Sequence, residues 1–245
     1  MHPELSIKKK IYIALSLIMI TSLLVLNSIF NVFHCNLRKD YKSINDRYFQ
    51  DVKDKIARLE KEELKDPTTI SRLAEQYNLI GTYYLERRLW DMTIDSFNKS
   101  IKYGNRNANA FYSIGLAYAN RGVENNSAED INNAEINYRK AIERSTDLLD
   151  AKYALSILLF YHRDNGKDEA LTLINEIIVK NRAYYPARFA DGRFNYETGN
   201  KERALKIYQD LASDLDKLPP SGINNDYKTE CRNNITRIMT ELSMR

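Results

Sequence analysis

A spacing of 34 residues recurs in this sequence and constrains its fold more than any other feature. Gly81 and Gly115 lie 34 residues apart, and each stands among aromatic and aliphatic residues, in "YNLIGTYYL" and "FYSIGLAYA". Ala170 and Ala204 have the same separation, in "DEALTLI" and "ERALKIY". A fixed period of this length indicates repeated helix–turn–helix units. Because one such pair of helices cannot bury its apolar face alone, at least three units must stack.

The composition favours helices over a sheet. Only 8 glycines and 5 prolines occur among the 245 residues, so few residues are suited to tight turns. Hydrophobic residues make up 43% of the chain, which is ordinary for a chain that buries a core. We therefore expect an all-α fold with short connections between its helices.

Four units can be aligned on the 34-residue period, and each has small and aromatic residues in a similar order. The matching positions are Tyr77, Ile80, Gly81, Tyr84, Thr93, Phe97 and Ser100 in the first unit, Phe111, Ile114, Gly115, Tyr118, Ala134, Tyr138 and Ala141 in the second, Ile157, Leu158, Tyr161, Ala170, Ile174 and Ile177 in the third, and Gly192, Gly199, Ala204, Tyr208 and Leu211 in the fourth. In this pattern the units resemble the tetratricopeptide repeat (TPR) family. The resemblance implies a right-handed superhelical solenoid of antiparallel helix pairs, with about four repeats over residues 66–216.

The departures from the family pattern are local. Thr93 and Ser100 are polar where alanine is usual, Leu158 replaces the glycine of the third unit, and Asn195 replaces the tyrosine of the fourth. The second unit carries about seven extra residues by comparison with the family period. They fall in "RGVENNSAED", and we expect them as an insertion between the two helices of that unit.

Residues 217–245 are expected to form a capping helix after the last repeat. "LPPSG" gives a turn, and the sequence after it places one apolar stripe against asparagine and charged residues. That stripe consists of Tyr227, Cys231, Ile235, Ile238 and Leu242. Cys231 is accordingly interpreted as a small core residue and not as a reactive thiol.

The amino-terminal residues predict a membrane anchor. Residues 11–33 hold no charge, and Lys8, Lys9 and Lys10 come directly before them. A run of 23 such residues is long enough to cross a bilayer as one helix. Since basic residues favour the cytoplasmic side, we expect a short cytoplasmic segment (1–10), an uncleaved signal anchor (11–33), and the bulk of the chain on the outer side.

Two other interpretations of the same segment stay open. A cleaved signal peptide should end in small residues, whereas this segment ends in "NSIFNVFHC". A lipoprotein signal would make Cys35 the lipidated residue, but His34 stands where a small residue is needed.

Residues 34–65 are expected to contain a connector helix. Ile44, Tyr48, Val52, Ile56 and Leu59 recur at spacings of three or four and form one apolar stripe. The stripe favours packing onto the domain that follows. The alternative is a short coil through which the chain forms a homo-oligomer.

The resemblance also implies a binding surface. In a stack of such units the first helix of each pair lines the concave face. The partner-binding residues expected there are Asn78, Thr82, Tyr112, Leu116, Lys152, Leu159, His162, Phe189, Arg193 and Tyr196. Tyr112, Phe189 and Tyr196 are the expected aromatic contacts to a bound peptide.

One subtype of the family grips the carboxylate tail of heat-shock chaperones with a fixed set of lysine, asparagine and arginine residues. Asn78 and Thr82 stand here where that set needs Lys and Asn, and Ser113 and Ser156 stand where it needs Asn and a basic residue. Only Lys152 fits. A chaperone-tail clamp is therefore not expected.

Neither catalysis nor a cofactor is indicated by the sequence. There is no glycine-rich phosphate loop, and the three histidines and two cysteines have no metal-ligand spacing. The formal net charge is +4, and the residues after the amino-terminal segment are nearly balanced, which gives no electrostatic case for nucleic acid. We expect no enzyme, no metal site and no cofactor.

The functional expectation is a membrane-tethered TPR scaffold or adaptor in a bacterial cell envelope. It would be a single-pass protein of the inner (cytoplasmic) membrane with its repeats in the periplasm, binding another protein or a peptide segment and assisting assembly or stability of an envelope complex. The alternative is a structural envelope protein that self-associates through the connector helix.

Overall fold

A computed structural model describes residues 46–62 and 66–244 of the chain, and these residues form helices and no strand. The chain divides into two compact units, residues 1–58 and 59–245. In the first unit the described residues belong to a helical stretch over 46–60. The predicted membrane anchor (11–33) and the first part of the connector segment lie outside the described residues. None of the helices in the described part is both long and apolar enough to span a membrane.

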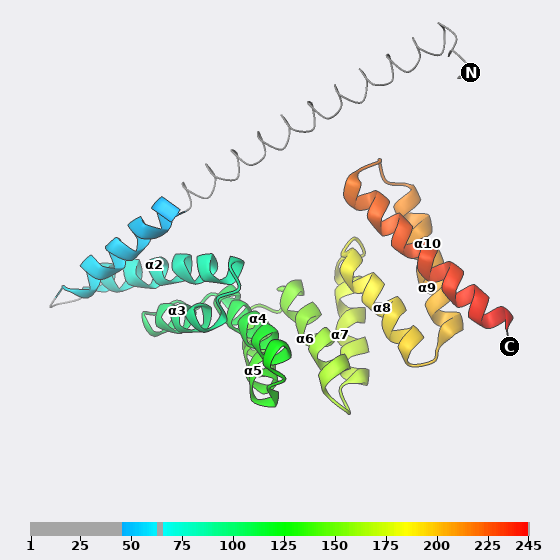
Figure 1. Cartoon of the computed structure of the whole chain (residues 1–245), viewed down its shortest axis with the longest axis horizontal. Coiled ribbons are helices and arrows are strands. Elements are labelled where there is room, and N and C mark those ends of the chain that lie inside the picture. Colours follow the sequence, from blue (N-terminus) through cyan, green and yellow to red (C-terminus); the bar gives the residue numbers. More distant parts are fainter. Residues whose placement is uncertain (1–45, 63–65, 245) are drawn as a thin grey trace, which may run out of the picture. The chain divides into compact units, whose positions relative to one another are not determined.

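The second unit is a succession of antiparallel helix pairs (Figure 1). The helices are α2 (Pro67–Glu86), α3 (Trp90–Lys102), α4 (Ala108–Asn125), α5 (Ala128–Arg144), α6 (Leu149–His162), α7 (Lys167–Lys180), α8 (Tyr185–Glu197), α9 (Lys201–Asp216) and α10 (Gly222–Ser243). Each helix packs on the next one, and the first helices of successive pairs also touch, α2 with α4, α4 with α6, and α6 with α8. The all-helical prediction is confirmed for the described residues.

Capping residues set several of the helix starts. Asp66 precedes α2 and accepts a hydrogen bond from the backbone N–H of Thr69 at 2.6 Å. Ser221 caps α10 in the same way, through the N–H of Asn224 at 3.1 Å. Both satisfy an N–H group that the first turn of a helix leaves without a partner.

The two helices of a pair meet at the repeated glycine. A Cβ atom on Gly115 would stand 2.6 Å from ring carbons of Tyr138, so a larger residue fits only if the ring moves. Gly81 has the same relation to Phe97, at 3.0 Å, and Gly192 to Tyr208, at 2.6 Å. Small residues let two helices approach closely, and the aromatic ring on the second helix fills the space beside the contact.

The third pair solves the same packing problem with different residues. Leu158 occupies the glycine position, and Ile174 occupies the position of the aromatic ring. Both are buried in one hydrophobic cluster, with exposed fractions of 4% and 0%. A larger residue on the first helix is thus matched by a smaller one on the second, which conserves the total volume.

The extra residues of the second unit lengthen its helices. The prediction placed "RGVENNSAED" between α4 and α5, but α4 continues to Asn125 and α5 begins at Ala128. Only Asn126 and Ser127 form the turn, with Asn126 in the left-handed region (φ 52°). The helices extend because Ser127 caps α5 by accepting from the N–H of Asp130, and because Gly122 allows Ile131 to pack against α4.

Helix α10 closes the second unit with the predicted apolar stripe. Cys231 and Ile238 are completely buried and join a cluster with Leu211 and Leu215 of α9. Burial raises the pKa of the Cys231 thiol to about 12, so the thiol stays protonated at neutral pH. Cys231 is therefore a core residue, as predicted.

Candidate functional site

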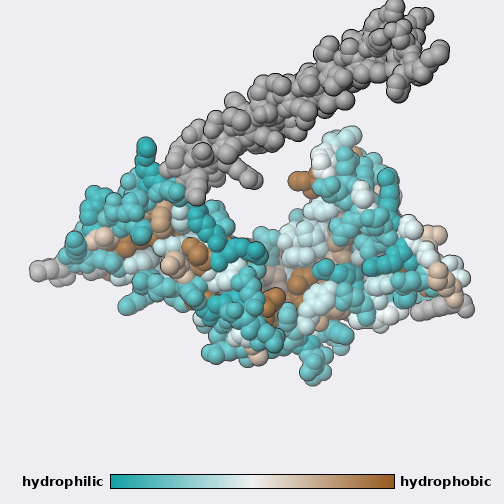
Figure 2. Space-filling view, in the orientation of Figure 1, coloured by the Kyte–Doolittle hydropathy of each residue, from teal (hydrophilic) through white to brown (hydrophobic). Residues whose placement is uncertain are grey.

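Two of the cavities on the first helices of the repeats share Tyr153. The central cavity, of about 410 Å³, lies between α4 and α6 and is lined by Arg88, Tyr112, Leu116, Ala119, Asn120, Val123, Glu124, Ile131, Tyr138, Tyr153, Ala154, Ile157, Leu158 and His162. The C-terminal cavity, of about 300 Å³, is lined by Tyr153, Pro186, Phe189, Ala190, Arg193, Tyr208, Tyr227, Glu230, Asn234 and Arg237. We call the two together the inner groove. Figure 2 shows patches of hydrophobic surface on a face of the molecule that is otherwise mostly hydrophilic.

The central cavity has an apolar and aromatic lining. Tyr112 and Leu116 come from α4, and Tyr153 and Ile157 come from α6. The Tyr112 ring lies 6.1 Å from the ring of Tyr138, which is the residue that packs on Gly115. Burial raises the pKa of Tyr112 to about 12, so its hydroxyl remains a neutral donor at physiological pH. The lining suits an apolar side chain, with a few polar groups left to orient it.

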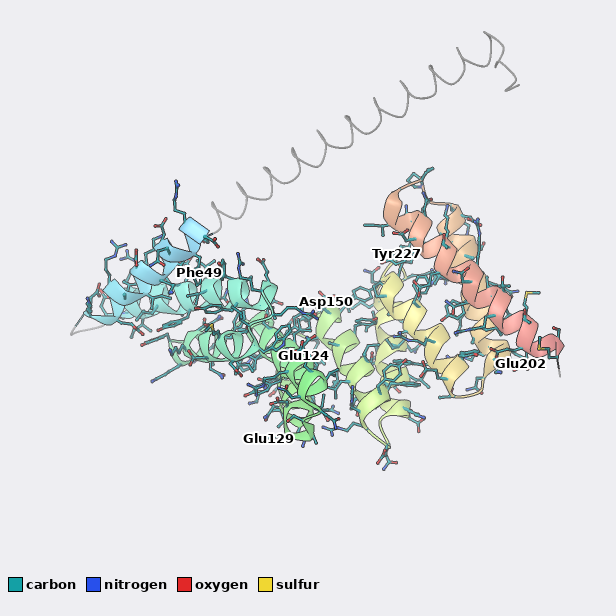
Figure 3. The ribbon with its side chains drawn as sticks, in the orientation of Figure 1. Phe49, Glu124, Glu129, Asp150, Glu202 and Tyr227 are labelled. Carbon is teal, nitrogen blue, oxygen red and sulfur yellow. The ribbon has the colours of Figure 1, made fainter. Side chains whose placement is uncertain are left out.

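The charged residues of the central cavity are few. Apart from its tyrosines, the ionisable residues of its lining are Arg88, Glu124 and His162. Glu124, which is labelled in Figure 3, accepts a hydrogen bond from Trp90 Nε1 at 2.7 Å, so part of its charge is already engaged. This leaves most of the cavity wall without a charge.

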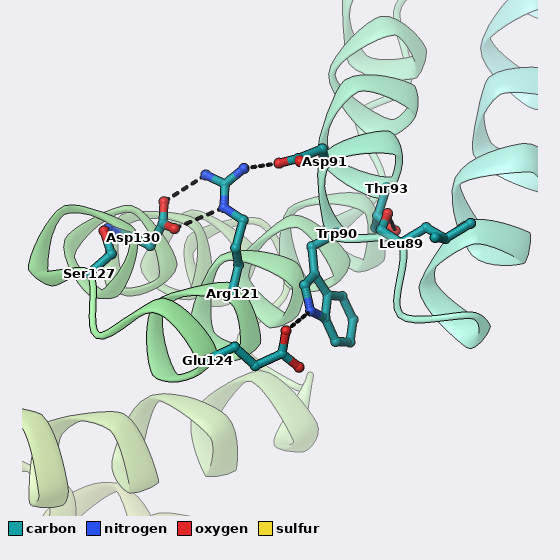
Figure 4. A network of polar contacts seen from close by, with 8 residues as sticks. All are labelled: Leu89, Trp90, Asp91, Thr93, Arg121, Glu124, Ser127 and Asp130. Carbon is teal, nitrogen blue, oxygen red and sulfur yellow. Dashed lines mark hydrogen bonds and ion pairs between the residues drawn. The ribbon is translucent and has the colours of Figure 1, made fainter.

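A polar network next to the central cavity ties the first pair of helices to the second (Figure 4). Arg121 donates from Nε and Nη2 to both carboxylate oxygens of Asp130, at 2.8 and 2.6 Å, and from Nη1 to Asp91. Hydrogen bonds from Arg121 hold the pKa of Asp130 below its usual value. The lengthened ends of α4 and α5 are thereby fixed to the start of α3, beside the bond between Trp90 and Glu124.

The C-terminal cavity is lined by both α8 and α10, although the sequence pattern predicted groove residues on the first and only a capping role for the second. The Phe189 ring on α8 lies 6.2 Å from the Tyr208 ring and 5.3 Å from the Tyr227 ring of α10. Tyr227 is labelled in Figure 3 on the carboxyl-terminal helix. Burial raises the pKa of Tyr153 and of Tyr208. The cavity thus has an aromatic floor.

Helix α10 supplies lining residues that were not predicted. Tyr227, Glu230, Asn234 and Arg237 all line the C-terminal cavity. Their spacing of three, four and three residues places them on one face of a helix. Tyr227 belongs to the apolar stripe, and the other three lie beside it. That spacing is visible in the sequence and could have identified them. Helix α10 is both the cap of the stack and a wall of the groove.

Five of the ten predicted binding residues line the inner groove. They are Tyr112, Leu116, His162, Phe189 and Arg193. The structure brings the first three together in the central cavity and the other two in the C-terminal cavity. Of the predicted aromatic contacts, Phe189 is mostly buried, with 9% of its surface exposed.

The other five lie elsewhere. Asn78 lines a separate cavity between α2 and the turn before α4, where Asn105 donates to its side chain at 3.1 Å. Thr82 is exposed and donates to the carbonyl of Asn78. Lys152 forms an ion pair with Glu176 at 2.6 Å.

Leu159 and Tyr196 complete the set. Leu159 is 3% exposed and belongs to the hydrophobic core, so its side chain does not line the groove. Tyr196 donates to Glu241 of α10 at 2.7 Å, and its ring lies 4.3 Å from the guanidinium of Arg237. Tyr196 therefore connects α8 to α10 and supports a lining residue instead of lining the groove itself.

Within residues 46–62 and 66–244, no group of three or more histidine, cysteine, aspartate or glutamate side chains is placed to hold a metal ion.

Comparison with solved structures identifies the fold. A tetratricopeptide repeat protein from Parabacteroides merdae ATCC 43184 is similar to this chain with a TM-score of 0.60 and 15% identity, over 84% of this chain and 76% of that protein. Two structures of MamA are similar with TM-scores of 0.50, one at 22% identity over 59% of this chain and 79% of MamA, the other at 17% over 69% and 91%. No protein-family model and no curated protein matches the chain. The likeness to solved structures shows that the fold is TPR-like.

Proposed function

We propose that this chain is a binding protein, not an enzyme, and that its inner groove holds a segment of another protein. The observation that carries the proposal is the central cavity, in which Tyr112, Leu116 and Ile157 face an open space of about 410 Å³. A concave and mostly apolar surface with a few polar groups at its edge is typical of a site that a ligand covers. The position of the cavity on the first helices of a TPR-like stack supports a peptide as the ligand.

The role that follows is that of an adaptor or scaffold. Its repeats would present a rigid groove, because the helix pairs are packed through the glycine contacts and joined by ion pairs between repeats, such as Arg139 with Glu169 at 2.7 Å. A rigid groove loses little conformational freedom when a peptide binds. Such a protein would assist assembly or stability of a complex to which its partner belongs.

Site-specific photocrosslinking in cells tests this proposal. A photoreactive amino acid at position 112 or 193 should capture one and the same partner, whereas the exposed positions Ile136 and Val179 on α5 and α7 should not. Tyr112→Ala should reduce the capture from position 193, with the helical content unchanged. Equal capture from positions 136 and 179 would show that the partner binds outside the groove.

The expected setting is the inner membrane of a bacterium, with the repeats in the periplasm. Three lysines followed by 23 uncharged residues support an uncleaved anchor over residues 11–33. In cell fractions the chain should stay with the membrane after alkaline extraction and should be digested by protease added to the outer side of the inner membrane. Protection from that protease would reverse the proposed orientation.

The mass of the mature chain distinguishes the anchor from its alternatives. An intact amino terminus supports the uncleaved anchor. A chain that begins at Cys35 and carries a diacylglyceryl group would instead identify a lipoprotein, and a chain shortened without lipid would identify a cleaved signal peptide.

A structural role through self-association is the second candidate. The apolar stripe of the connector segment is the sequence observation that favours it; in the structure Tyr48 of this stripe is 52% exposed, whereas Val52 and Ile56 are buried. In this case a chain that begins at residue 40 should sediment as an oligomer and one that begins at residue 66 as a monomer. Two monomers would remove the main support for this candidate.

A further inference from the structure

The inner groove carries different chemistry at its two ends. The central cavity is lined mainly by Tyr112, Leu116 and other uncharged residues. The C-terminal cavity adds two guanidinium groups, Arg193 from α8 and Arg237 from α10, and one carboxylate, Glu230. Two cations and one anion leave the lining of this end with a formal charge of +1.

Both arginines of the C-terminal cavity lie close to aromatic rings. The guanidinium of Arg193 lies 5.6 Å from the centre of the Tyr161 ring, and that of Arg237 lies 4.3 Å from the centre of the Tyr196 ring. Both distances lie within the roughly 6 Å range of a cation–π contact, and a contact through the face of a guanidinium leaves N–H groups at its edge to bind a carboxylate. Asn234 further orients Arg237 by accepting a hydrogen bond from Nη2 at 3.0 Å.

Glu230 lines the same cavity as these arginines, and two further carboxylates nearby, Glu197 and Glu241, are engaged with other residues. Glu197 accepts from the Tyr161 hydroxyl at 2.8 Å. Glu241 accepts from the Tyr196 hydroxyl at 2.7 Å and pairs with Lys201 at 2.6 Å. Within residues 46–62 and 66–244, no carboxylate lies within 4.0 Å of either Arg193 or Arg237.

We propose that Arg193 and Arg237 form a subsite for an acidic side chain of the bound segment, an aspartate or a glutamate, while the central cavity takes a bulky apolar side chain of the same segment. The inference rests on the proposed function of the groove. Charge complementarity selects the occupant, because an excess of positive charge on an aromatic floor is matched by a carboxylate. Tyr153 lies at the junction of the two cavities and lets one segment span both.

The geometry also sets the spacing of the two side chains. The apolar residues of the central cavity come from α4 and α6, and the two arginines of the C-terminal cavity come from α8 and α10, two steps further along the series α4, α6, α8 and α10. Because packed helices lie about 8–10 Å apart, the apolar residues and the arginine pair are separated by roughly 16–20 Å. An extended chain advances about 3.3 Å per residue. The acidic residue is therefore expected about five or six positions from the apolar residue.

Selection from a displayed library tests the subsite. The full-length chain in detergent is immobilised and presented with random 12-residue peptides fused through their carboxyl ends to a phage coat protein, so that acidic groups come from side chains. The same selection is made with the double variant Arg193→Gln/Arg237→Gln. The matched control is Arg144→Gln, because Arg144 also stacks on a ring, that of Phe111 at 4.5 Å, but does not line the groove.

The expected result is enrichment of aspartate or glutamate about five or six positions from a bulky apolar residue. The double variant should keep the apolar preference and lose the acidic one, and Arg144→Gln should select like the parent chain. Replacing the acidic residue of a selected peptide by its amide should weaken binding to the parent chain about tenfold, and should change binding to the double variant little.

The outcomes separate the subsite from the groove. Apolar peptides enriched without an acidic preference, or with the same preference in the double variant, would overturn the subsite and leave the groove in place. A parent chain that enriches no peptide would contradict the proposed function as well as the subsite.

Discussion

Replacing Gly115 by alanine tests the packing of the repeats. The added Cβ would stand 2.6 Å from two ring carbons of Tyr138 and 3.3 Å from the backbone oxygen of Ala134. Carbon atoms in contact prefer about 3.5–4.0 Å, so the ring must move by about 1 Å. Tyr138 is 2% exposed, and the room for such a movement lies toward the central cavity, which its ring also lines.

The expected size of the effect combines two opposing terms. Alanine is favoured over glycine inside a helix by about 1 kcal/mol, whereas overpacking a core costs about 1–3 kcal/mol. Because the added atom is closer than van der Waals contact to a buried ring, we place the cost near the upper end and expect a net destabilisation of about 1.5 kcal/mol. For a folded unit of this size, that corresponds to a fall in Tm of roughly 3–6 °C.

The matched control is Gly222→Ala. Gly222 begins α10, and a Cβ there would meet nothing within 4 Å. Thermal unfolding followed by circular dichroism should show a lower Tm for Gly115→Ala and an unchanged or slightly higher Tm for Gly222→Ala. A Gly115→Ala chain as stable as the control would refute the reasoning.

A double variant isolates the contact between the two helices. Tyr138→Leu alone removes a buried ring and should destabilise the fold by about 2–4 kcal/mol. In Gly115→Ala/Tyr138→Leu the alanine has room, so the double variant should be destabilised by at least 0.5 kcal/mol less than the sum of the two single variants. The pair Leu158 and Ile174 in the third repeat shows that the fold accepts this redistribution of volume.

Three further predictions concern polar contacts. Asp130→Asn should destabilise the chain by about 2 kcal/mol in urea unfolding, because the mostly buried partner Arg121 loses a charged bidentate acceptor; an unchanged midpoint would contradict the role of this pair. Trp90→Phe should cost about 1 kcal/mol through loss of the hydrogen bond to Glu124, and Glu124→Ala should then add little. The hydrogen bond from Arg182 holds the pKa of Asp214 at about 2, below the usual 3.8. A carboxyl group whose pKa is lower in the folded chain than in the unfolded chain stabilises the fold at pH values above the unfolded pKa, so this contribution should disappear as the pH falls from about 4 through 2. Asp214→Asn should therefore show a smaller drop in Tm over that window than the parent chain.

The packing inside the repeats was readable from the sequence because it depends on local patterns. The repeat pattern pairs each glycine of a first helix with an aromatic residue of the second helix, Gly81 with Phe97 and Gly115 with Tyr138. The structure places both pairs in contact. The stripe of α10 was equally clear, since its apolar residues recur at helical spacing, and Cys231 and Ile238 of this stripe are buried.

The groove residues were harder to predict where a helix is apolar on more than one side. In α6, Leu155, Leu158, Leu159 and Phe160 are all buried, so periodicity alone does not separate the face toward the groove from the face toward the core. The resemblance to the family placed Leu159 in the groove, whereas its side chain lies in the core.

Contacts over long separations also escape a sequence pattern. Tyr196 binds Glu241, 45 residues away, and the sequence does not reveal that pairing. The helix extension before Asn126 had a readable signal, because Ser127 is followed by Glu129 and Asp130, which are typical of a first turn. Comparison with the family period favoured an insertion instead.

Amide hydrogen exchange of the full-length chain, with and without a peptide selected from the library, tests the central claim most directly. Binding in the inner groove should slow exchange in α4, α6, α8 and α10, which line it, and leave α7, which lines neither cavity, unchanged. The peptide with its acidic residue amidated should protect α4 and α6 but lose much of the protection on α8 and α10. Protection confined to α7 would place the ligand outside the groove and contradict the account.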